Sequence, residues 1–411
     1  MKTICLVFYT HQPIVLKNFR FYEIGTNSTY FSETHNHANI EKLVKKKYKP
    51  LNAVLTKIFQ EHGSKFKVSF SFSGVTLDLL EFAAPEAICD LKKLNEFGPI
   101  EFLSETYSNS VLSKKYQHEF MQQTIKQKDK VLKLFGQIPK AFMNNYGYPI
   151  KFLANTLPQM GFKVVLQFQE ILPKAEGQPI NQFYVADTEA FQVLQSNKRI
   201  LQPFIKSSKK IDTDAFLQWI LSLPEDNEIV CLALDYLELI TQSTQDLQIL
   251  EFIEELPAKA SALNINFSSP SELFHTTNQK HKKKNLINLD TRQELEFNVS
   301  NDLQVEILMI LDGLKDKVYQ SNNEKIIKTW FYLQDQWLFN HLNLEGGVDA
   351  EKNKAIQHYI NFRNVLQDFT QRVEQTIAQS KLELKQNFQN PLHHVKPQHP
   401  VSSAEIFNTL F

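Results

Sequence analysis

Residues 66–74 read FKVSFSFSG, and this stretch indicates the fold class. Phe66, Val68, Phe70 and Phe72 alternate with lysine and serine, which is the period-two pattern of a β-strand, and Gly74 ends it. Other short apolar runs of strand length occur in the first 260 residues, at 3–9, 100–103, 141–143, 164–168 and 229–234. The sequence therefore predicts several short strands in this part of the chain.

Longer amphipathic stretches lie between these runs. Residues 115–135 and 245–256 carry apolar side chains at helical spacing; Leu250, Ile253 and Leu256, for example, share one face. Strands that alternate with helices predict parallel βα units. The pattern leaves two architectures open, a sheet covered by helices or a closed barrel.

The sequence also suggests where the chain divides. We expect a barrel-type domain at 1–265 and a polar connecting segment with some strand character at 266–304. A helical bundle should follow at 305–385, with Gly346 and Gly347 marking a turn inside it. The proline-containing residues 386–411 are expected to form a surface tail.

The composition excludes several classes of protein. Forty-five basic residues balance 45 acidic ones, so the formal net charge is zero. The chain thus lacks the overall positive charge that attracts nucleic acid or anionic membranes, and neither is expected as a partner. Hydrophobic residues make up 42%, including 32 Phe, which is enough for a sizeable core and argues against disorder.

The cysteines and the N-terminus point to a reducing compartment. Cys5, Cys89 and Cys231 are too scattered for a disulfide framework. The apolar run at 3–9 is shorter than the core of a signal peptide, and no stretch approaches the ~20 residues of a membrane helix. We therefore expect a cytoplasmic protein. Since phosphate-binding glycine motifs and Cys-x-x-Cys are missing from the sequence, we expect neither a cofactor nor a metal.

Polar residues at the ends of predicted strands are the first candidates for a site. His11 follows the first strand, Asp235 follows 229–234, and Glu101 and Glu105 lie within and just beyond 100–103. The carboxyl ends of parallel strands are where α/β proteins bind ligands. The structural alternatives are a capping role for His11 and a helix N-cap for Asp235.

Seven stretches resemble motifs of glycoside hydrolase family 57, most closely its bacterial α-amylase-like members. They are HQP at 11–13, FKVSFSFSG at 66–74, APE at 84–86, GPIEFLSETYSNSV at 98–111, MGFK at 160–163, DYLE at 235–238 and WFYLQ at 330–334. They occur in the family's order, and the resemblance covers residues 1–385. It implies an incomplete (β/α)7 barrel followed by a C-terminal helical bundle, and retaining chemistry on α-glucans without a metal.

The resemblance also implies where the catalytic carboxylates should be. Retaining hydrolysis uses two carboxyl groups roughly 5–5.5 Å apart. The family's general acid, the aspartate of a DYETFGEH-like motif, maps onto Asp235, and the later histidine of that motif maps onto Gln242. The nucleophile, the glutamate of an FRNTE-like motif, maps onto Tyr146. No Asp or Glu occurs between Asp129 and Glu170, so no nearby carboxylate could take its place through a small shift.

Other polar positions of the family site are also replaced. The aspartate of an LQTSDHFYYM-like motif maps onto Trp337, and the following histidine maps onto Leu338. Asp335 is two residues away, about 200° around a helix, so we do not expect it to substitute. The histidine expected after SETY maps onto Asn109. Aromatic side chains such as those of Tyr146 and Trp337 can stack on sugar rings, or they can simply fill the former pocket.

Three hypotheses follow for function. The first is a catalytically degenerate, α-amylase-like member of the family, a pseudoenzyme of carbohydrate metabolism that binds an α-glucan or maltooligosaccharide or acts through an unidentified protein partner. The second is an active α-glucan hydrolase or 4-α-glucanotransferase with a relocated carboxylate, Glu105 or Glu238. The third is a scaffold or regulatory protein unrelated to carbohydrate. Under the first hypothesis, Asp235 keeps the acid position, Tyr146 replaces the nucleophile, and the substrate contacts come from His11, Glu105, Trp337 and Glu238.

Overall fold

The computed structural model describes nine stretches of the chain. They are residues 1–26, 28–169, 184–185, 192–206, 210–224, 228–236, 246–277, 299–344 and 349–389. Everything stated below about the structure refers to these residues.

Seven parallel strands of the described chain form a nearly closed barrel. They are β1 (Thr3–Thr10), β2 (Val68–Phe72), β3 (Ile100–Leu103), β4 (Ala141–Asn144), β5 (Val164–Gln169), β7 (Gln192–Asn197) and β8 (Ile229–Asp235). Their order is β3-β2-β1-β8-β7-β5-β4. A single bridge between Ser104 and Phe142 brings the two edge strands together. Closure into a barrel is thus made by one residue pair, which fits the expected incomplete (β/α)7 architecture.

Two short strands extend this sheet. β6 (Tyr184–Val185) pairs antiparallel with β7, and β9 (Asn266–Phe267) pairs parallel with the start of β1. The sheet therefore continues just beyond residue 265, where the sequence analysis ended the barrel domain. The division into domains remains a prediction.

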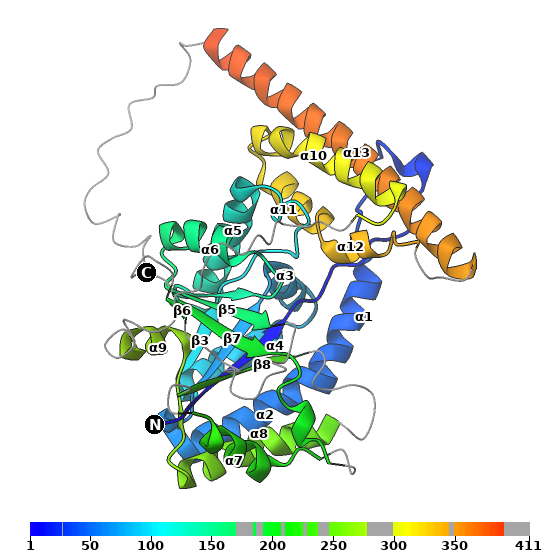
Figure 1. Cartoon of the computed structure of the whole chain (residues 1–411). Coiled ribbons are helices and arrows are strands. Elements are labelled where there is room, and N and C mark those ends of the chain that lie inside the picture. The colour runs from blue at the N-terminus through cyan, green and yellow to red at the C-terminus, as the bar shows by residue number, and fades with distance from the viewer. Residues whose placement is uncertain are drawn as a thin grey trace.

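Helices surround the barrel, as Figure 1 shows. They are α1 (Glu33–Leu43), α2 (Lys49–His62), α3 (Gly74–Ala83), α4 (Pro85–Phe97), α5 (Gln117–Phe135), α6 (Ile150–Thr156), α7 (Thr213–Ser222), α8 (Asp246–Ala262) and α9 (Pro270–Thr277). Strand and helix alternate along most of this part, which is why consecutive strands run parallel.

Alternate residues of β1 face two separate cores. Ile4, Leu6 and Phe8 belong to the cluster beneath the helices, whereas Cys5 and Val7 belong to a cluster inside the barrel. The serines of β2 are also fully buried. The alternation in FKVSFSFSG therefore separates residues that face the helices from residues that face the barrel interior, and neither set faces solvent. The polar interior face of β2 carries Ser71, which donates a hydrogen bond to Glu105.

The C-terminal helices form a layer over one end of the barrel (Figure 1). They are α10 (Asp302–Gln320), α11 (Glu324–Leu333), α12 (Gln336–Asn340) and α13 (Asp349–Gln389). The buried carboxylate of Glu119 on α5 accepts hydrogen bonds from Tyr319 of α10 (2.8 Å) and from Gln334 just after α11 (2.8 Å). These bonds fix the bundle against the barrel.

The structure confirms most of the predicted elements. All six predicted strands are present, and helices occupy 117–135, 246–262 and most of the described part of 305–380. β7 was not predicted, and the connecting segment expected at 266–304 contains the helix α9 in addition to the short strand β9. Gly346, Gly347 and the tail beyond Gln389 lie outside the described residues.

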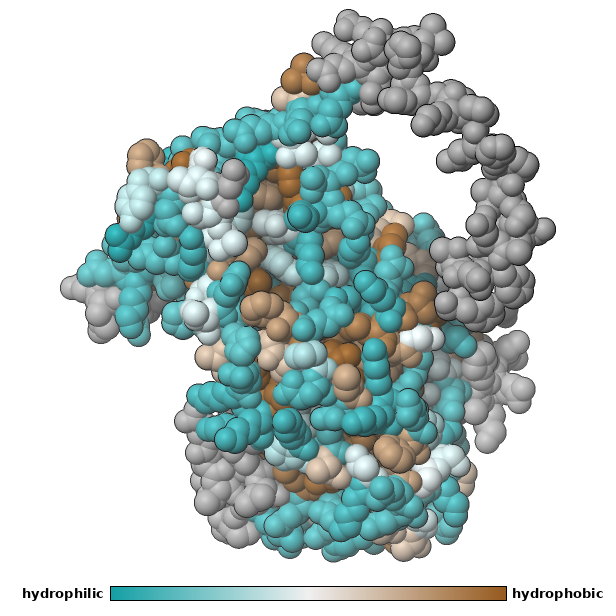
Figure 2. Space-filling model, turned by 180° about the vertical axis from the view of Figure 1, so that it is seen from behind, coloured by the Kyte–Doolittle hydropathy of each residue, from teal (hydrophilic) through white to brown (hydrophobic). Residues whose placement is uncertain are grey.

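The described surface carries both polar and apolar residues. Figure 2 shows one face, on which hydrophilic residues predominate and hydrophobic residues are exposed in small patches. None of the described helices combines the length and the apolar character that crossing a membrane would require.

Candidate functional site

His11 is the first polar side chain at the carboxyl end of the barrel. It directly follows β1, and its Nδ1 lies 2.9 Å from the Ser73 hydroxyl, while its Nε2 lies 2.8 Å from Oδ2 of Asp335. Burial opposes a charge on the imidazole, but the negative Asp335, with smaller contributions from Glu105 and Asp235, raises the pKa of His11 above its usual value. His11 therefore tends toward the protonated form.

Ser73 connects this histidine to the start of α3. It is the N-cap residue of α3, and its hydroxyl oxygen accepts a hydrogen bond from the backbone N–H of Thr76. The next residue, Gly74, is buried against Tyr107, and a Cβ atom there would lie 2.3 Å from the Tyr107 ring. A larger residue would therefore displace the turn that holds Ser73 against His11.

Glu105 is a fully buried carboxyl group two residues beyond β3. Ser71, on the interior face of β2, donates a hydrogen bond of 3.1 Å to its Oε1, and its Oε2 has no hydrogen-bond partner among the described residues. Burial raises the pKa of Glu105 to about 8, although the charge of His11 and the bond from Ser71 oppose the shift. Glu105 is thus predominantly protonated at neutral pH.

Tyr146 lies two residues beyond β4 and faces His11. The two rings are 5.8 Å apart in an edge-to-face arrangement. The Tyr146 hydroxyl interacts electrostatically with Glu105, but no hydrogen bond of normal geometry joins it to a described residue. Burial, reinforced by the negative charges of Glu105 and Asp335, raises the pKa of Tyr146, so its phenol stays protonated.

Asp235 is the last residue of β8, and its register partner is Tyr9, near the end of β1. It is only partly buried, and its charge contributes to the pKa values of both His11 and Glu105. The structure thus brings four of the predicted site residues, His11, Glu105, Tyr146 and Asp235, to one end of the barrel. We call this group, together with Asp335, the barrel mouth.

Asp335 is a site residue that regular helical spacing does not predict. A continuous helix through 335–337 would turn Asp335 away from the site, but α11 ends at Leu333 and α12 begins only at Gln336. Asp335 lies in the break as the N-cap of α12, where its Oδ1 accepts a hydrogen bond from the Trp337 N–H at 2.9 Å. Its other oxygen points to His11. The signal in the sequence was an aspartate two residues from the family position, at a helix start.

Trp337 lies next to the mouth but lines a different cavity. This cavity, of about 270 Å³, is bounded by residues 15–18 and by helices α12 and α13, and we call it the side pocket. The Trp337 ring lies 4.0 Å from the ring of His341. Glu238 and Gln242 fall outside the described residues, so the structure gives no position for them.

The acidic and imidazole groups do not assemble into a metal site within the described chain. No three His, Cys, Asp or Glu side chains of these residues lie close enough together to hold an ion.

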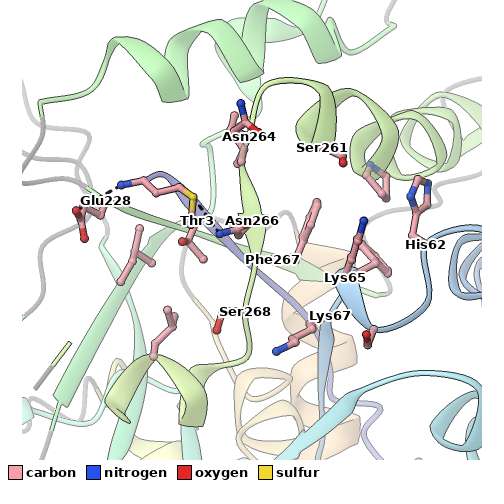
Figure 3. Close-up of a pocket in the computed structure, with 17 residues that line it drawn as sticks. Thr3, His62, Lys65, Lys67, Glu228, Ser261, Asn264, Asn266, Phe267 and Ser268 are labelled. Carbon is pink, nitrogen blue, oxygen red and sulfur yellow. Dashed lines mark hydrogen bonds and ion pairs between the residues drawn. The ribbon is translucent and has the colours of Figure 1, made fainter. Parts of the chain in front are cut away.

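A larger pocket, of about 630 Å³, lies at the opposite end of the barrel (Figure 3). It is lined by residues at or just before the starts of strands, including Thr3, Lys67, Glu228 and Asn266. Lys67 is paired with Glu272 at 2.6 Å, and the N-terminal amine lies 3.5 Å from Glu228. Barrels of this type carry their active sites at the carboxyl ends of the strands, so we place the site at the barrel mouth despite this pocket's greater size.

A comparison with protein families identifies the family of the chain. The model of glycosyl hydrolase family 57 matches residues 5–290, which is more than half of the chain and contains His11, Glu105, Tyr146 and Asp235. The chain belongs to this family. Asp335 and Trp337 lie outside the matched region.

Individual relatives agree with the family assignment. The chain is 23% identical over 441 residues to a Methanocaldococcus jannaschii protein named "Putative alpha-amylase", covering 98% of this chain and 91% of that protein. Among solved structures, a family 57 branching enzyme from Pyrococcus horikoshii has a TM-score of 0.62 at 11% identity and covers 92% of this chain and 94% of its own.

A second solved structure, the 4-α-glucanotransferase of Thermococcus litoralis, has a TM-score of 0.56 at 14% identity. The match covers 88% of this chain but only 59% of the glucanotransferase, so this chain corresponds to part of that enzyme's length. At these identities, the two solved structures support the shared fold and say nothing about a shared reaction.

Proposed function

We propose that this chain is an α-amylase-like member of family 57 that binds α-glucan chains at the barrel mouth without hydrolysing them. One observation carries the proposal. The motif resemblance aligns Tyr146 with the family's nucleophile, and burial raises the pKa of the neighbouring carboxyl group, Glu105, to about 8, so that group is mostly protonated at neutral pH. Neither group presents the anionic oxygen that must attack the anomeric carbon in the retaining mechanism.

The alternative with a relocated nucleophile is less well supported at Glu105. Its Oε1 is held by Ser71, and its pKa of about 8 leaves little of the attacking carboxylate at neutral pH. Loss of such a nucleophile costs on the order of 10⁴- to 10⁶-fold in turnover, so residual hydrolysis should be negligible.

Buried polar atoms at the mouth and in the segment just after β3 support sugar binding. Asn109 Oδ1 makes no hydrogen bond to any described residue, and Glu105 Oε2, Thr106 Oγ1 and Tyr146 Oη have only weak contacts, between Glu105 and Tyr146 and between Thr106 and Tyr148. Buried polar groups ordinarily have partners. Sugar hydroxyls both donate and accept, so they can satisfy carboxyl, hydroxyl and amide groups together. The ring of Tyr146 adds an aromatic surface on which a sugar ring can stack.

Calorimetric titration tests the proposal. The wild-type protein should bind α-linked maltooligosaccharides saturably, bind β-linked oligosaccharides of equal length at least tenfold more weakly, and release no product in a parallel assay. Glu105→Ala should weaken binding about tenfold, since it removes hydrogen-bonding atoms from the mouth. The matched control is Glu101→Ala, because Glu101 is the second residue of β3 and thus lies near the amino end of the strand that Glu105 follows. Absence of binding to every α-glucan, or equal effects of the two variants, would contradict the proposal.

A further inference from the structure

The pocket of about 630 Å³ at the amino ends of the barrel strands has no part in the proposed function (Figure 3). We call it the amino-end pocket. Its walls include the turn between α2 and β2, the start of β8, and the turn between α8 and β9. Small-molecule sites commonly measure roughly 300–1,000 Å³, so this pocket is large enough for an organic ligand.

The turn between α2 and β2 brings hydrogen-bond donors and a positive charge to the pocket. It reads His-Gly-Ser-Lys at 62–65, and the side chains of His62, Ser64 and Lys65 line the cavity. Gly63 has a φ of +54°, which glycine adopts readily and which turns the chain sharply after α2. Lys65 is exposed, and neither its ammonium group nor the His62 imidazole makes a hydrogen bond or an ion pair with a described residue. Both groups are therefore available to a ligand.

The other charged side chains that line the pocket already have partners. Lys67 Nζ lies 2.6 Å from Glu272 Oε1, and Glu228 lies 3.5 Å from the N-terminal amine. Partial burial opposes a charge on Glu272, but hydrogen bonds, first among them the one from Lys67, outweigh burial and lower its pKa. Lys67 and Glu272 thus form an ion pair at neutral pH. The charge that remains uncompensated among the described lining residues is the positive charge of Lys65.

The rest of the lining suits the body of an organic molecule. The floor is apolar and consists of residues that are at most 9% exposed: Ile229, Ile265, Phe267 and Leu273. The rim carries neutral side chains that form hydrogen bonds, those of Ser64, Ser261, Asn264 and Asn266. An apolar floor below a polar rim with one positive side is the usual composition of a site for a small organic anion.

Backbone hydrogen bonds hold the walls of the pocket in place. The N–H of Asn266 donates to the carbonyl oxygen of Lys2 at 3.1 Å, and the N–H of Ser268 donates to the carbonyl oxygen of Ile4 at 3.1 Å. These bonds pair β9 with the start of β1. A further bond of 2.9 Å from the N–H of Ile265 closes the turn before β9. The pocket is thus already formed, and a ligand does not have to order its walls.

We infer that the amino-end pocket binds a small organic phosphate. The phosphate group lies against the turn at 62–65, and the organic body covers the apolar floor. A phosphate monoester carries a charge of about −1.5 to −2 at pH 7 and offers three acceptor oxygens. These oxygens match the ammonium, imidazole and hydroxyl donors of Lys65, His62 and Ser64. Since the pocket and the barrel mouth lie at opposite ends of the barrel, the inference does not depend on the proposed function.

Calorimetric titration of the full chain tests this inference. The organic phosphates are adenosine monophosphate and phenyl phosphate; adenosine, inorganic phosphate and benzoate each lack the organic body or the phosphate. At least one organic phosphate should bind saturably and at least tenfold more tightly than these three compounds. Added salt should weaken its binding.

Variants of the exposed Lys65 locate the bound phosphate without threatening the fold. Lys65→Glu replaces attraction by repulsion and should weaken binding at least tenfold, whereas Lys65→Arg keeps the charge and should stay within about threefold of wild type. The matched control is Lys46→Glu, at an exposed lysine between α1 and α2 that does not line the pocket. It should leave the affinity within about twofold.

Each contrary result overturns a stated part of the inference. If neither organic phosphate binds, or if Lys65→Glu and Lys46→Glu have equal effects, the pocket is not a phosphate site. If benzoate binds as tightly as phenyl phosphate, the phosphate group is not what is recognised. If inorganic phosphate binds as tightly as the organic phosphates, the apolar floor takes no part. Maltooligosaccharide binding, measured on the same samples, tests the proposed function separately, so either idea can fail alone.

Discussion

Two buried carboxyl groups of this protein, Asp78 and Glu105, have opposite surroundings. Asp78 on α3 accepts hydrogen bonds from the hydroxyls of Tyr107 and Tyr332, and its other oxygen lies 2.7 Å from Lys130 and 3.0 Å from Lys328. Glu105 has one hydrogen bond of normal geometry, from Ser71, and a weaker contact with the Tyr146 hydroxyl.

Their pKa values differ accordingly. Burial would raise the pKa of Asp78, but the two ammonium groups outweigh burial and hold its pKa below the usual range. Burial dominates at Glu105 and raises its pKa to about 8. Asp78 is therefore a structural ion, which links α3 to α5 and α11. Glu105 is a buried carboxyl group whose pKa is strongly raised, and such groups are common at functional sites.

The largest effect should come from removing the charge of Asp78. Asp78→Ala leaves Lys130 and Lys328 without their shared carboxylate, so we expect a loss of about 3–5 kcal/mol in the free energy of unfolding. Urea denaturation at pH 7 measures this. Asp316→Ala, at a side chain that is 95% exposed, is the control and should change the stability by less than about 0.5 kcal/mol.

The same comparison predicts a dependence on pH. Since the folded pKa of Asp78 is lowered, its stabilisation is present above its ordinary pKa of 3.8 and is lost as the pH falls through the lower folded value. Wild type should thus lose more stability than Asp78→Ala on acidification below pH 4. Parallel curves for the two proteins would show that Asp78 is not a structural ion.

A smaller effect of opposite sign should come from Glu105→Gln. The pKa of Glu105 is raised from 4.5 to about 8 on folding, so its neutral form favours the folded state below pH 4.5, and this advantage disappears as the pH rises through about 8. Glutamine stays neutral, so the variant should be more stable than wild type at pH 7, on the order of 2–3 kcal/mol. Thermal or urea unfolding between pH 4 and pH 9 measures the difference.

The control for this prediction is Glu61→Gln, an exposed position that should leave the pH profile unchanged. If Glu105→Gln proved less stable than wild type at pH 7, the carboxylate form of Glu105 would be the native one. The contrast with Asp78 would then disappear, and a nucleophilic role for Glu105 would regain support.

The sequence predicted the barrel strands well where apolar side chains dominate. Residues 3–9 and 229–234 are recognisable because both faces of these strands are buried, one under helices and one inside the barrel. β7 was missed because its sequence, QVLQSN, is mostly polar, and its Ser196 is buried through a hydrogen bond to the carbonyl oxygen of Cys231. Its sequence shows no regular alternation of apolar and polar residues from which a strand could be predicted.

The site was predictable only in part. His11, Glu105 and Asp235 follow strand ends, so the rule for parallel sheets found them. Asp335 could not be found in this way, because its position depends on a break between α11 and α12 that the helical pattern conceals. The protonated state of Glu105 was also beyond the sequence, since it depends on burial and on which polar atoms lack partners.

The most direct test of the account is a search for a covalent glycosyl intermediate. Wild type would be incubated with a fluorinated α-glucosyl trapping reagent and then with maltooligosaccharides, and intact-mass spectrometry and product analysis would follow. Because no anionic oxygen is available at Tyr146 or Glu105, we predict an unchanged protein mass and no product above the blank. A glycosyl adduct on any residue, or turnover that Asp235→Asn abolishes, would contradict the account.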